Sequence, residues 1–254
     1  MDNKMYSEDC YYLLANAGII GIPCVSLQVM CIPAPIAGFL LGGGVHNQLV
    51  ASAKVVQLAH QIDPDNKVGC MCAGFFAYPY TCDPNDFLKL QQEAQAGFYL
   101  FSDVFVRGYY PSYAKSIFDK EGVVMNVSEE DKADLAAGKV DYMAFSYYNS
   151  SCITTHEVDA TVKGNMTGSI KNPYLDASEW GWQIDPVGFK RALHELYDRY
   201  QLPLLVIENG LGAQDTLEAD GTIHDPYRVD YMKRHIAAMK EAVEEGVDLM
   251  GYTM

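Results

Sequence analysis

Basic residues are scarce in this sequence: 18 lysines and arginines stand against 33 aspartates and glutamates, and the net charge at pH 7 is −15. A field of that sign repels phosphate backbones and anionic lipid head groups, which argues against a nucleic-acid partner. A small anionic ligand remains compatible with it. Salt screens the mean field beyond about 10 Å, and a single lysine or a helix N-terminus can bind an anion locally.

Charged residues are absent between Asp9 and Lys54, and residues 11–41 are long enough to span a bilayer. Three prolines and three glycines interrupt that stretch, however, and no basic cluster flanks it. We therefore expect no membrane segment, and a protein tethered through residues 11–41 is kept as a minor alternative.

A disulfide framework and a secretion signal are also missing. The seven cysteines are scattered, and the first nine residues include acids where a signal peptide needs a basic region. Cys70 and Cys72 form only a CxC pair, which is typical of small buried side chains in a strand. We expect a cytoplasmic protein with no metal and no cofactor.

What the sequence does contain is an alternation of helices and strands. Apolar periodicity and turn signals predict helices at 46–62, 128–137, 186–200 and 225–245, and strands at 25–30, 67–73, 140–147, 203–207 and 247–252. Such alternation predicts an α/β protein with about five parallel strands. It does not distinguish an open sheet from part of a barrel, although no glycine-rich phosphate-binding motif follows any of these strands.

The sharpest local signal is an apolar strand that ends in Ile207-Glu208-Asn209-Gly210. Carboxylates at the C-terminal ends of parallel strands lie where barrel enzymes collect their catalytic residues. A glutamate that merely caps the following loop is the alternative. The two tryptophans, Trp180 and Trp182, offer flat apolar faces of the kind that pack against sugars, although core packing of at least one is an equal alternative.

Four separated motifs carry a resemblance to a known family. They are Ile207-Glu208-Asn209-Gly210, the run from Ser178 to Pro186, the run from Phe101 to Tyr113, and Phe145-Ser146-Tyr147-Tyr148. From about residue 31 to 252 the chain resembles the C-terminal part of glycoside hydrolase family 1, of the bacterial 6-phospho-β-glucosidase type. The resemblance implies a (βα)8 barrel, here incomplete, over residues 31–254, and residues 1–30 stay unassigned.

The resemblance also implies roles for residues. Glu208 would be the nucleophile of a retaining β-glycosidase, and Tyr148 matches the tyrosine whose hydroxyl contacts that nucleophile. We add Trp180 as a sugar-binding residue. Glu179 and Asp185 match no acid/base position, and Asp185 before Pro186 is better explained as a helix cap.

The acid/base carboxyl that the family mechanism needs has no counterpart here. Its place in the resemblance falls on Leu27 or Gln28, and no aspartate or glutamate occurs between Asp9 and Asp63. We therefore expect hydrolysis of phosphorylated β-glucosides to be absent or severely impaired in this chain, and exposed barrel edges to favour self-association. The alternative from another class is a noncatalytic carbohydrate-binding or assembly protein.

Overall fold

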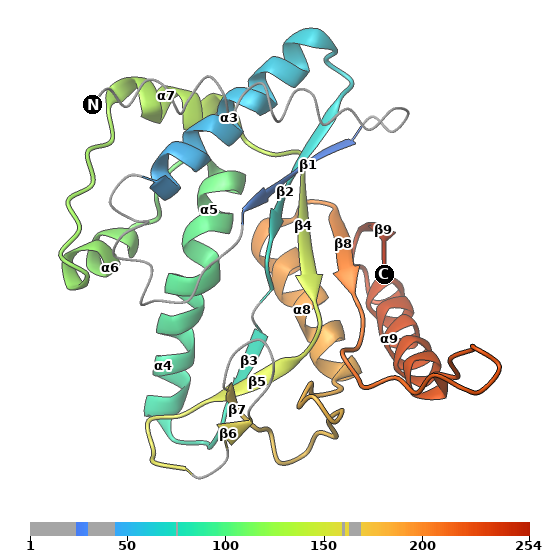
Figure 1. Cartoon of the computed structure of the whole chain (residues 1–254). Helices are drawn as coiled ribbons and strands as arrows, with labels where there is room; N and C mark the ends of the chain where they lie inside the picture. Colours follow the sequence, from blue (N-terminus) through green and yellow to red (C-terminus); the bar gives the residue numbers. More distant parts are fainter. Residues whose placement is uncertain (1–23, 30–43, 75, 159–160, 163–168) are drawn as a thin grey trace. The chain divides into compact units, whose positions relative to one another are not determined.

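The computed structural model describes residues 24–29, 44–74, 76–158, 161–162 and 169–254 (Figure 1). These residues form two compact units. The first combines the described residues up to Ala73 with Gln95–Ala144, and the second combines Gly74–Ala94 with Phe145–Met254.

The first unit holds two parallel strands, the start of a third, and most of the helices. Its elements are β1 (Cys24–Val29), α3 (Gly44–Ile62), β2 (Lys67–Cys72), the π-helix η1 (Gln95–Tyr99), α5 (Leu100–Arg107), α6 (Ala114–Lys120), α7 (Glu129–Ala137) and the beginning of β4 (Tyr142–Tyr147). β1 and β2 pair in parallel, and β2 is followed in the sheet by β4. A Cβ atom on Gly69 would overlap the Tyr142 ring, so the two strands approach closely because residue 69 has no side chain.

A capping box at Ser128 explains why the start of α7 could be predicted from the sequence. Ser128 accepts a hydrogen bond from the Asp131 backbone N–H at 3.0 Å, and the Asp131 carboxylate accepts one from the Ser128 N–H at 3.0 Å. This reciprocal capping box satisfies N–H groups that have no partner within the helix. The predicted helices at 46–62 and 128–137 are confirmed as α3 and α7, whereas α5 and α6 were not predicted.

The second unit contains the remaining strands and the two longest C-terminal helices. Its elements are β3 (Phe76–Pro79), α4 (Pro84–Ala94), the end of β4, β5 (Ser150–Ile153), β6 (Thr161–Val162), β7 (Ser169–Ile170), α8 (Pro186–Tyr200), β8 (Leu204–Asn209), α9 (Pro226–Glu244) and β9 (Leu249–Tyr252). β8 lies between β4 and β9, and β8 and β9 are parallel. All five predicted strands are therefore present, in the order β1-β2-β4 in the first unit and β4-β8-β9 in the second.

The second unit also contains a smaller sheet, which the sequence analysis did not predict. β3 pairs in parallel with β5, β5 pairs antiparallel with β7, and β7 pairs antiparallel with β6. These strands contain only two to four residues. They are too short for a period-two pattern to emerge from the sequence.

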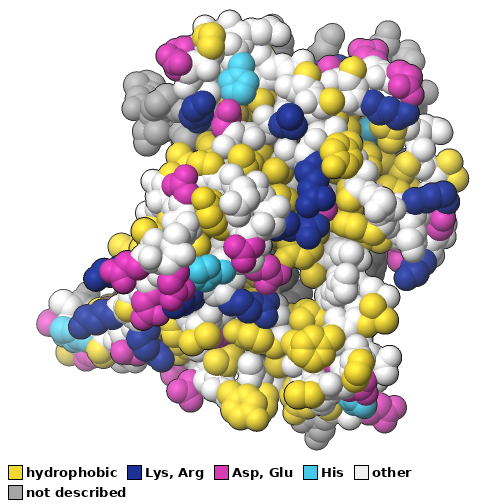
Figure 2. Space-filling view, turned by 180° about the vertical axis from the view of Figure 1, so that it is seen from behind, with side chains coloured by type: hydrophobic (Ala, Val, Ile, Leu, Met, Phe, Trp, Pro, Cys, Tyr) yellow, Lys and Arg dark blue, Asp and Glu magenta, His cyan; other side chains and the backbone are white. Residues whose placement is uncertain are grey.

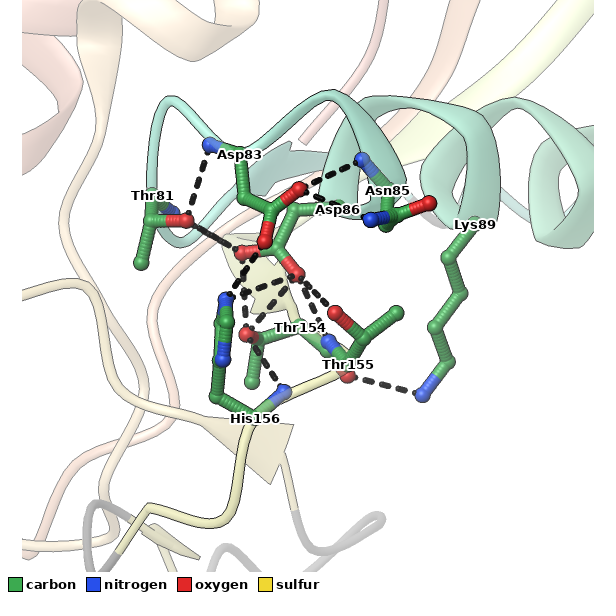
Figure 3. A network of polar contacts seen from close by, with 8 residues as sticks. All are labelled: Thr81, Asp83, Asn85, Asp86, Lys89, Thr154, Thr155 and His156. Carbon is green, nitrogen blue, oxygen red and sulfur yellow. Dashed lines mark hydrogen bonds and ion pairs between the residues drawn. The ribbon is translucent and has the colours of Figure 1, made fainter.

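Asp86 in α4 joins the segment that follows β3 to the segment that follows β5 (Figure 3). Its carboxylate is fully buried and accepts hydrogen bonds from the Thr81 hydroxyl at 2.7 Å, the Thr154 hydroxyl at 2.9 Å and the Thr155 backbone N–H at 2.6 Å. Burial alone would raise the pKa of the Asp86 carboxyl, but these donors outweigh it and hold the pKa well below its usual range. Asp86 thus fastens the start of α4 to the segment that follows β5.

We expect Asp86→Asn to lower the thermal midpoint by at least roughly 5 °C at pH 7, because in either orientation the amide NH₂ would face a backbone N–H, that of Thr81 or that of Thr155, which cannot accept. Asp83→Asn is the matched control: Asp83 Oδ1 accepts from the Asn85 backbone N–H, which an amide oxygen can also do. Circular dichroism melts of the two variants make the comparison. Equal midpoints would show that the buried carboxylate does not hold the small sheet.

Among the described residues, no helix is long and apolar enough to cross a bilayer. Most of the 11–41 stretch lies outside the described residues, and the part within them, Cys24–Val29, is strand β1. Over the face seen in Figure 2, acidic and basic side chains are interspersed with apolar ones.

Candidate functional site

Glu208 lies at the C-terminal end of β8, as predicted. The strand is built from Leu204, Leu205, Val206 and Ile207, and Leu204 and Val206 are fully buried. Burial of these alternate side chains fixes the strand in its sheet, and the chain emerges at Glu208 and Asn209. The carboxylate is therefore carried by a rigid element rather than by a loop.

This carboxylate accepts a hydrogen bond from Tyr148. Tyr148 follows directly after β4, and its hydroxyl donates to Glu208 Oε2 at 2.9 Å. Burial and the hydrogen bond to Glu208 raise the pKa of Tyr148 to about 12, so the hydroxyl stays protonated at neutral pH and can act as a donor. Within the described residues no lysine, arginine or histidine forms an ion pair with Glu208. The contact that the resemblance implied is thus present, while the roles of both residues stay predictions.

Asn209 anchors the end of β8 to the neighbouring chain. Its Nδ2 donates to the Tyr147 carbonyl at 2.7 Å and to the Tyr231 hydroxyl at 2.9 Å, and its Oδ1 accepts from the Tyr252 hydroxyl at 2.8 Å. Both hydrogens and the oxygen of the amide are therefore used, in a site where Asn209 is only 4% exposed. The residue beside Glu208 is held to β4, α9 and β9 at once.

Tyr231 of helix α9 contacts Asn209 and the backbone of Tyr148. The Tyr231 hydroxyl, besides accepting from Asn209, donates to the Tyr148 carbonyl at 3.0 Å. The ring of His235 stacks on the Tyr231 ring at 3.7 Å between centroids, and both side chains are fully buried. Tyr231 therefore connects the backbone of Tyr148 with the side chain that follows Glu208.

The two tryptophans differ in their surroundings. Trp182 is half-buried and packs edge-on against the Tyr148 ring, with 5.4 Å between ring centroids. Trp180 remains 43% exposed. A Cβ atom on Gly212 would overlap both indole rings, so the loop after β8 can lie against them only with glycine at that position. Trp182 thus has the packing role that the sequence left open, and Trp180 presents a free apolar face.

The other positions that the sequence analysis weighed as acidic groups lie in different surroundings. Asp185 caps α8 through the Gly188 N–H at 2.7 Å and accepts from the Tyr78 hydroxyl at 2.9 Å, as its position before Pro186 predicted. Glu179 is exposed. Leu27 and Gln28, at the predicted acid/base place, lie in β1, opposite Cys70 and Met71 of β2.

Asn209 and Tyr231 are the site residues that sequence reasoning did not select. Asn209 stands directly after Glu208 in the motif, which was the available signal. Tyr231 and His235 are spaced i, i+4 in α9 and so share a helix face, but nothing in the sequence indicates that this face meets the end of β8.

A parallel α/β fold with a hydrogen-bonded carboxylate at a strand end is the arrangement in which barrel enzymes place their catalytic residues, and comparison with known proteins identifies the family. The model of glycosyl hydrolase family 1 matches residues 43–254. The chain belongs to this family. The predicted fold class, α/β of the (βα)8 barrel family with about five parallel strands, is thereby confirmed.

Relatives of known activity include aryl-phospho-β-D-glucosidase BglH of Bacillus subtilis, which is 47% identical over 82% of this chain and 44% of its own length. The 6-phospho-β-glucosidase of Dickeya chrysanthemi is 44% identical over 82% of this chain and 45% of its own. Aryl-phospho-β-D-glucosidase BglA of B. subtilis is 45% identical over the whole of this chain and 52% of its own length. The chain therefore spans about half the length of these relatives.

Solved structures agree with the family assignment. The family 1 β-glucosidase of Thermotoga maritima superposes with a TM-score of 0.69 at 26% identity, over 85% of this chain and 47% of that protein. The same enzyme in complex with glucoimidazole gives a TM-score of 0.68 over the same share of each chain.

Proposed function

We propose that this chain carries the nucleophile side of a retaining β-glycosidase site for phosphorylated β-glucosides. Glu208 is the nucleophile, Tyr148 orients it, and Trp180 packs against the sugar. The observation that carries the proposal is the hydrogen bond from Tyr148 to Glu208 at the C-terminal end of β8. The names of the phospho-β-glucosidase relatives support the substrate class.

The chemistry proposed for the chain is the first half of a double displacement. A Glu208 carboxylate oxygen attacks the anomeric carbon, the bond from that carbon to the leaving oxygen breaks, and the leaving group departs with the electron pair. Retaining enzymes place a second carboxyl about 5–5.5 Å away to protonate the leaving oxygen. The corresponding place here holds Leu27 or Gln28, neither of which is an acid. Only a leaving group that departs without protonation should therefore react.

The test uses a dinitrophenyl 2-deoxy-2-fluoro-6-phospho-β-glucoside and the purified chain. We expect a burst of no more than about one equivalent of dinitrophenolate per chain, with the fluorosugar attached to the peptide that contains Glu208. Mass spectrometry of the digested protein locates the label. Natural disaccharide phosphates should give no product, because loss of general acid catalysis costs about 10²–10⁴-fold.

Two variants sharpen this experiment. Glu208→Gln should abolish both the burst and the label, whereas Glu179→Gln removes an exposed carboxylate close to Trp180 in the sequence and should retain them. When the non-fluorinated analogue is the substrate, azide should release the sugar from Glu208, because this small nucleophile needs no general base. Efficient steady-state hydrolysis of an unactivated 6-phospho-disaccharide would contradict the proposal that the site lacks an acid.

A noncatalytic carbohydrate-binding protein is the second candidate, and the exposed face of Trp180 favours it. Quenching of tryptophan fluorescence by a 6-phospho-β-glucoside, without burst or label, would support this function over the first.

We also propose a cytoplasmic location and no nucleic-acid partner. The free cysteines among the described residues and the net charge of −15 support these two points.

A further inference from the structure

Arg228, in the first turn of α9, binds the loop that follows the candidate nucleophile. Its Nε donates to the Leu211 carbonyl at 3.2 Å, and its Nη2 donates to the Ala213 carbonyl at 3.4 Å. Nη2 also donates to Asp215 Oδ2 at 3.1 Å, while Nη1 donates to Asp215 Oδ1. One guanidinium group therefore holds the loop at two backbone carbonyls and, through a bidentate ion pair, at Asp215.

Side-chain contacts decide the conformation of this loop. Residues 211–216, all within the described part of the chain, belong to no helix or strand. Leu211 and Ala213 are buried, and Trp182 packs against the apolar cluster that they form with Tyr231. The planar guanidinium of Arg228 fixes the direction of both carbonyls at once, which a lysine ammonium group cannot do.

The loop also supports the two tryptophans. Gly212, between the two carbonyls that Arg228 binds, lies so close to the indoles that a Cβ atom there would stand 2.7 Å from Trp182 and 2.9 Å from Trp180. The Gly212 carbonyl accepts from the Ser178 hydroxyl at 2.6 Å, and the Ser178 backbone N–H donates to the Trp182 carbonyl at 2.9 Å. A displacement of the loop would therefore move the surface on which both rings rest.

Trp182 connects this arrangement with the candidate nucleophile. Its ring packs edge-on against Tyr148, whose hydroxyl donates to Glu208. Among the described residues, Arg228 forms no hydrogen bond or ion pair with Tyr148 or Glu208. Any influence of Arg228 on the site must therefore pass through the loop and the tryptophans.

We propose that Arg228 is a positioning residue: it fixes the loop from Leu211 to Asp215, and through that loop it orients Trp180 and Trp182 for recognition of the sugar. The orientation of the tryptophans is independent of the proposed function. The consequence for the sugar rests on the proposed function, and the experiment below separates the two.

Tryptophan fluorescence tests the orientation directly, because in a Trp180→Phe background Trp182 is the single tryptophan of the chain. Arg228→Met should raise the acrylamide quenching constant of Trp182 roughly twofold, since a loop that loses its charge-assisted contacts opens more often. Arg234→Met is the matched control. It removes the same charge from the same helix, but Arg234 pairs with Asp230 at 2.9 Å and should leave the quenching unchanged. Equal quenching in the two variants would overturn the proposal.

A second variant covers the case in which Arg228→Met does not fold. Far-UV circular dichroism shows whether its helices are retained. If they are lost, Asp215→Asn decides, because it keeps one acceptor for the guanidinium but removes the charge and the bidentate pair. We expect it to raise the quenching constant roughly 1.5-fold, in the same direction as Arg228→Met. No change in Asp215→Asn would then overturn the proposal.

The consequence for the sugar is measured in the chain with both tryptophans, from the concentration dependence of Glu208 labelling by the dinitrophenyl fluorosugar. Arg228→Met should raise the half-saturating concentration roughly fivefold, because the sugar loses a properly oriented aromatic surface. The limiting rate of labelling should change less than about twofold. A lower limiting rate at an unchanged half-saturating concentration would show that Arg228 acts on the nucleophile instead. If the unaltered chain forms no label, the nucleophile proposal fails, whereas the quenching comparison still decides whether Arg228 positions Trp182.

Discussion

Asn209→Asp should lower the free energy of unfolding by about 3 kcal/mol at pH 7, a large effect for the exchange of an NH₂ group for an oxygen. The Asn209 amide donates to the Tyr147 carbonyl and the Tyr231 hydroxyl and is almost completely buried. A carboxylate can donate to neither. It would face the Tyr147 carbonyl oxygen with a negative charge at an almost completely buried position, and a buried charge without a donor is strongly destabilising.

Urea unfolding at pH 7 measures this effect, and Asn172→Asp serves as the matched control. Asn172 uses its Oδ1 to accept from the Tyr174 N–H at 3.0 Å, which a carboxylate oxygen can also do. The control should change stability by less than about 0.5 kcal/mol. A comparable loss in both variants would show that added negative charge, rather than the lost donor, is responsible. In the trapping experiment Asn209→Asp should also slow labelling of Glu208, because Asn209 holds the end of β8.

Acidification should destabilise the protein through His235. Burial lowers the pKa of this imidazole to about 4, against a smaller opposing effect of the hydrogen bond to the Tyr231 carbonyl. Because a carbonyl only accepts, Nδ1 carries the proton, and Nε2 has no hydrogen-bond partner among the described residues. Protonation of Nε2 would therefore place a positive charge in a buried site between aromatic rings.

The sign of the pH dependence follows from the lowered pKa of His235. Between about pH 6.5, where an unfolded histidine titrates, and about pH 4, the unfolded chain binds a proton that the folded chain does not. The stabilising contribution of neutral His235 is thus complete above pH 6.5 and is lost as the pH falls toward 4. Over that interval the loss should amount to about 3 kcal/mol.

Urea unfolding at a series of pH values, compared with His235→Gln, isolates this contribution, since the acidic residues titrate in both proteins. The difference in stability between the two should shrink by about 3 kcal/mol from pH 7 to pH 4. His224→Gln, at an exposed histidine in the same unit, should run parallel to the unaltered chain. A constant difference between the unaltered chain and His235→Gln would show that His235 does not titrate in this range.

Much of the larger fold was readable from local signals. Strand 203–207 and helix 186–200 are continuous apolar or periodic runs with a proline at the helix start, and the structure reproduces them as β8 and α8. The small sheet was not predicted because its strands are short and pair with partners far apart in sequence. The hydrogen bonds of Asp86 likewise join residues that are distant in sequence. Local propensity carries no information about such partners.

The candidate site divides in the same way. The residues from Ile207 to Gly210 by themselves identified a carboxylate at a strand end and, through resemblance, a family that the comparisons then confirmed. What the sequence could not specify is the set of side chains that surround that strand end. Tyr231 and His235 are separated from Tyr148 by more than eighty residues, and the amide of Asn209 meets three partners on three different elements.

The sequence by itself thus predicted the class of fold, a candidate nucleophile at the end of a strand and the lack of an acid at the matching place, because each prediction depends on residue type and short-range order; the comparisons confirm the fold class. Only the tertiary structure decided which tryptophan packs on Tyr148 and which stays exposed, and that Tyr231 of α9 supports the end of β8. The periodicity of α9 identifies its apolar residues but does not specify which side of the helix is buried. Which flank is buried depends on where the neighbouring elements lie in space.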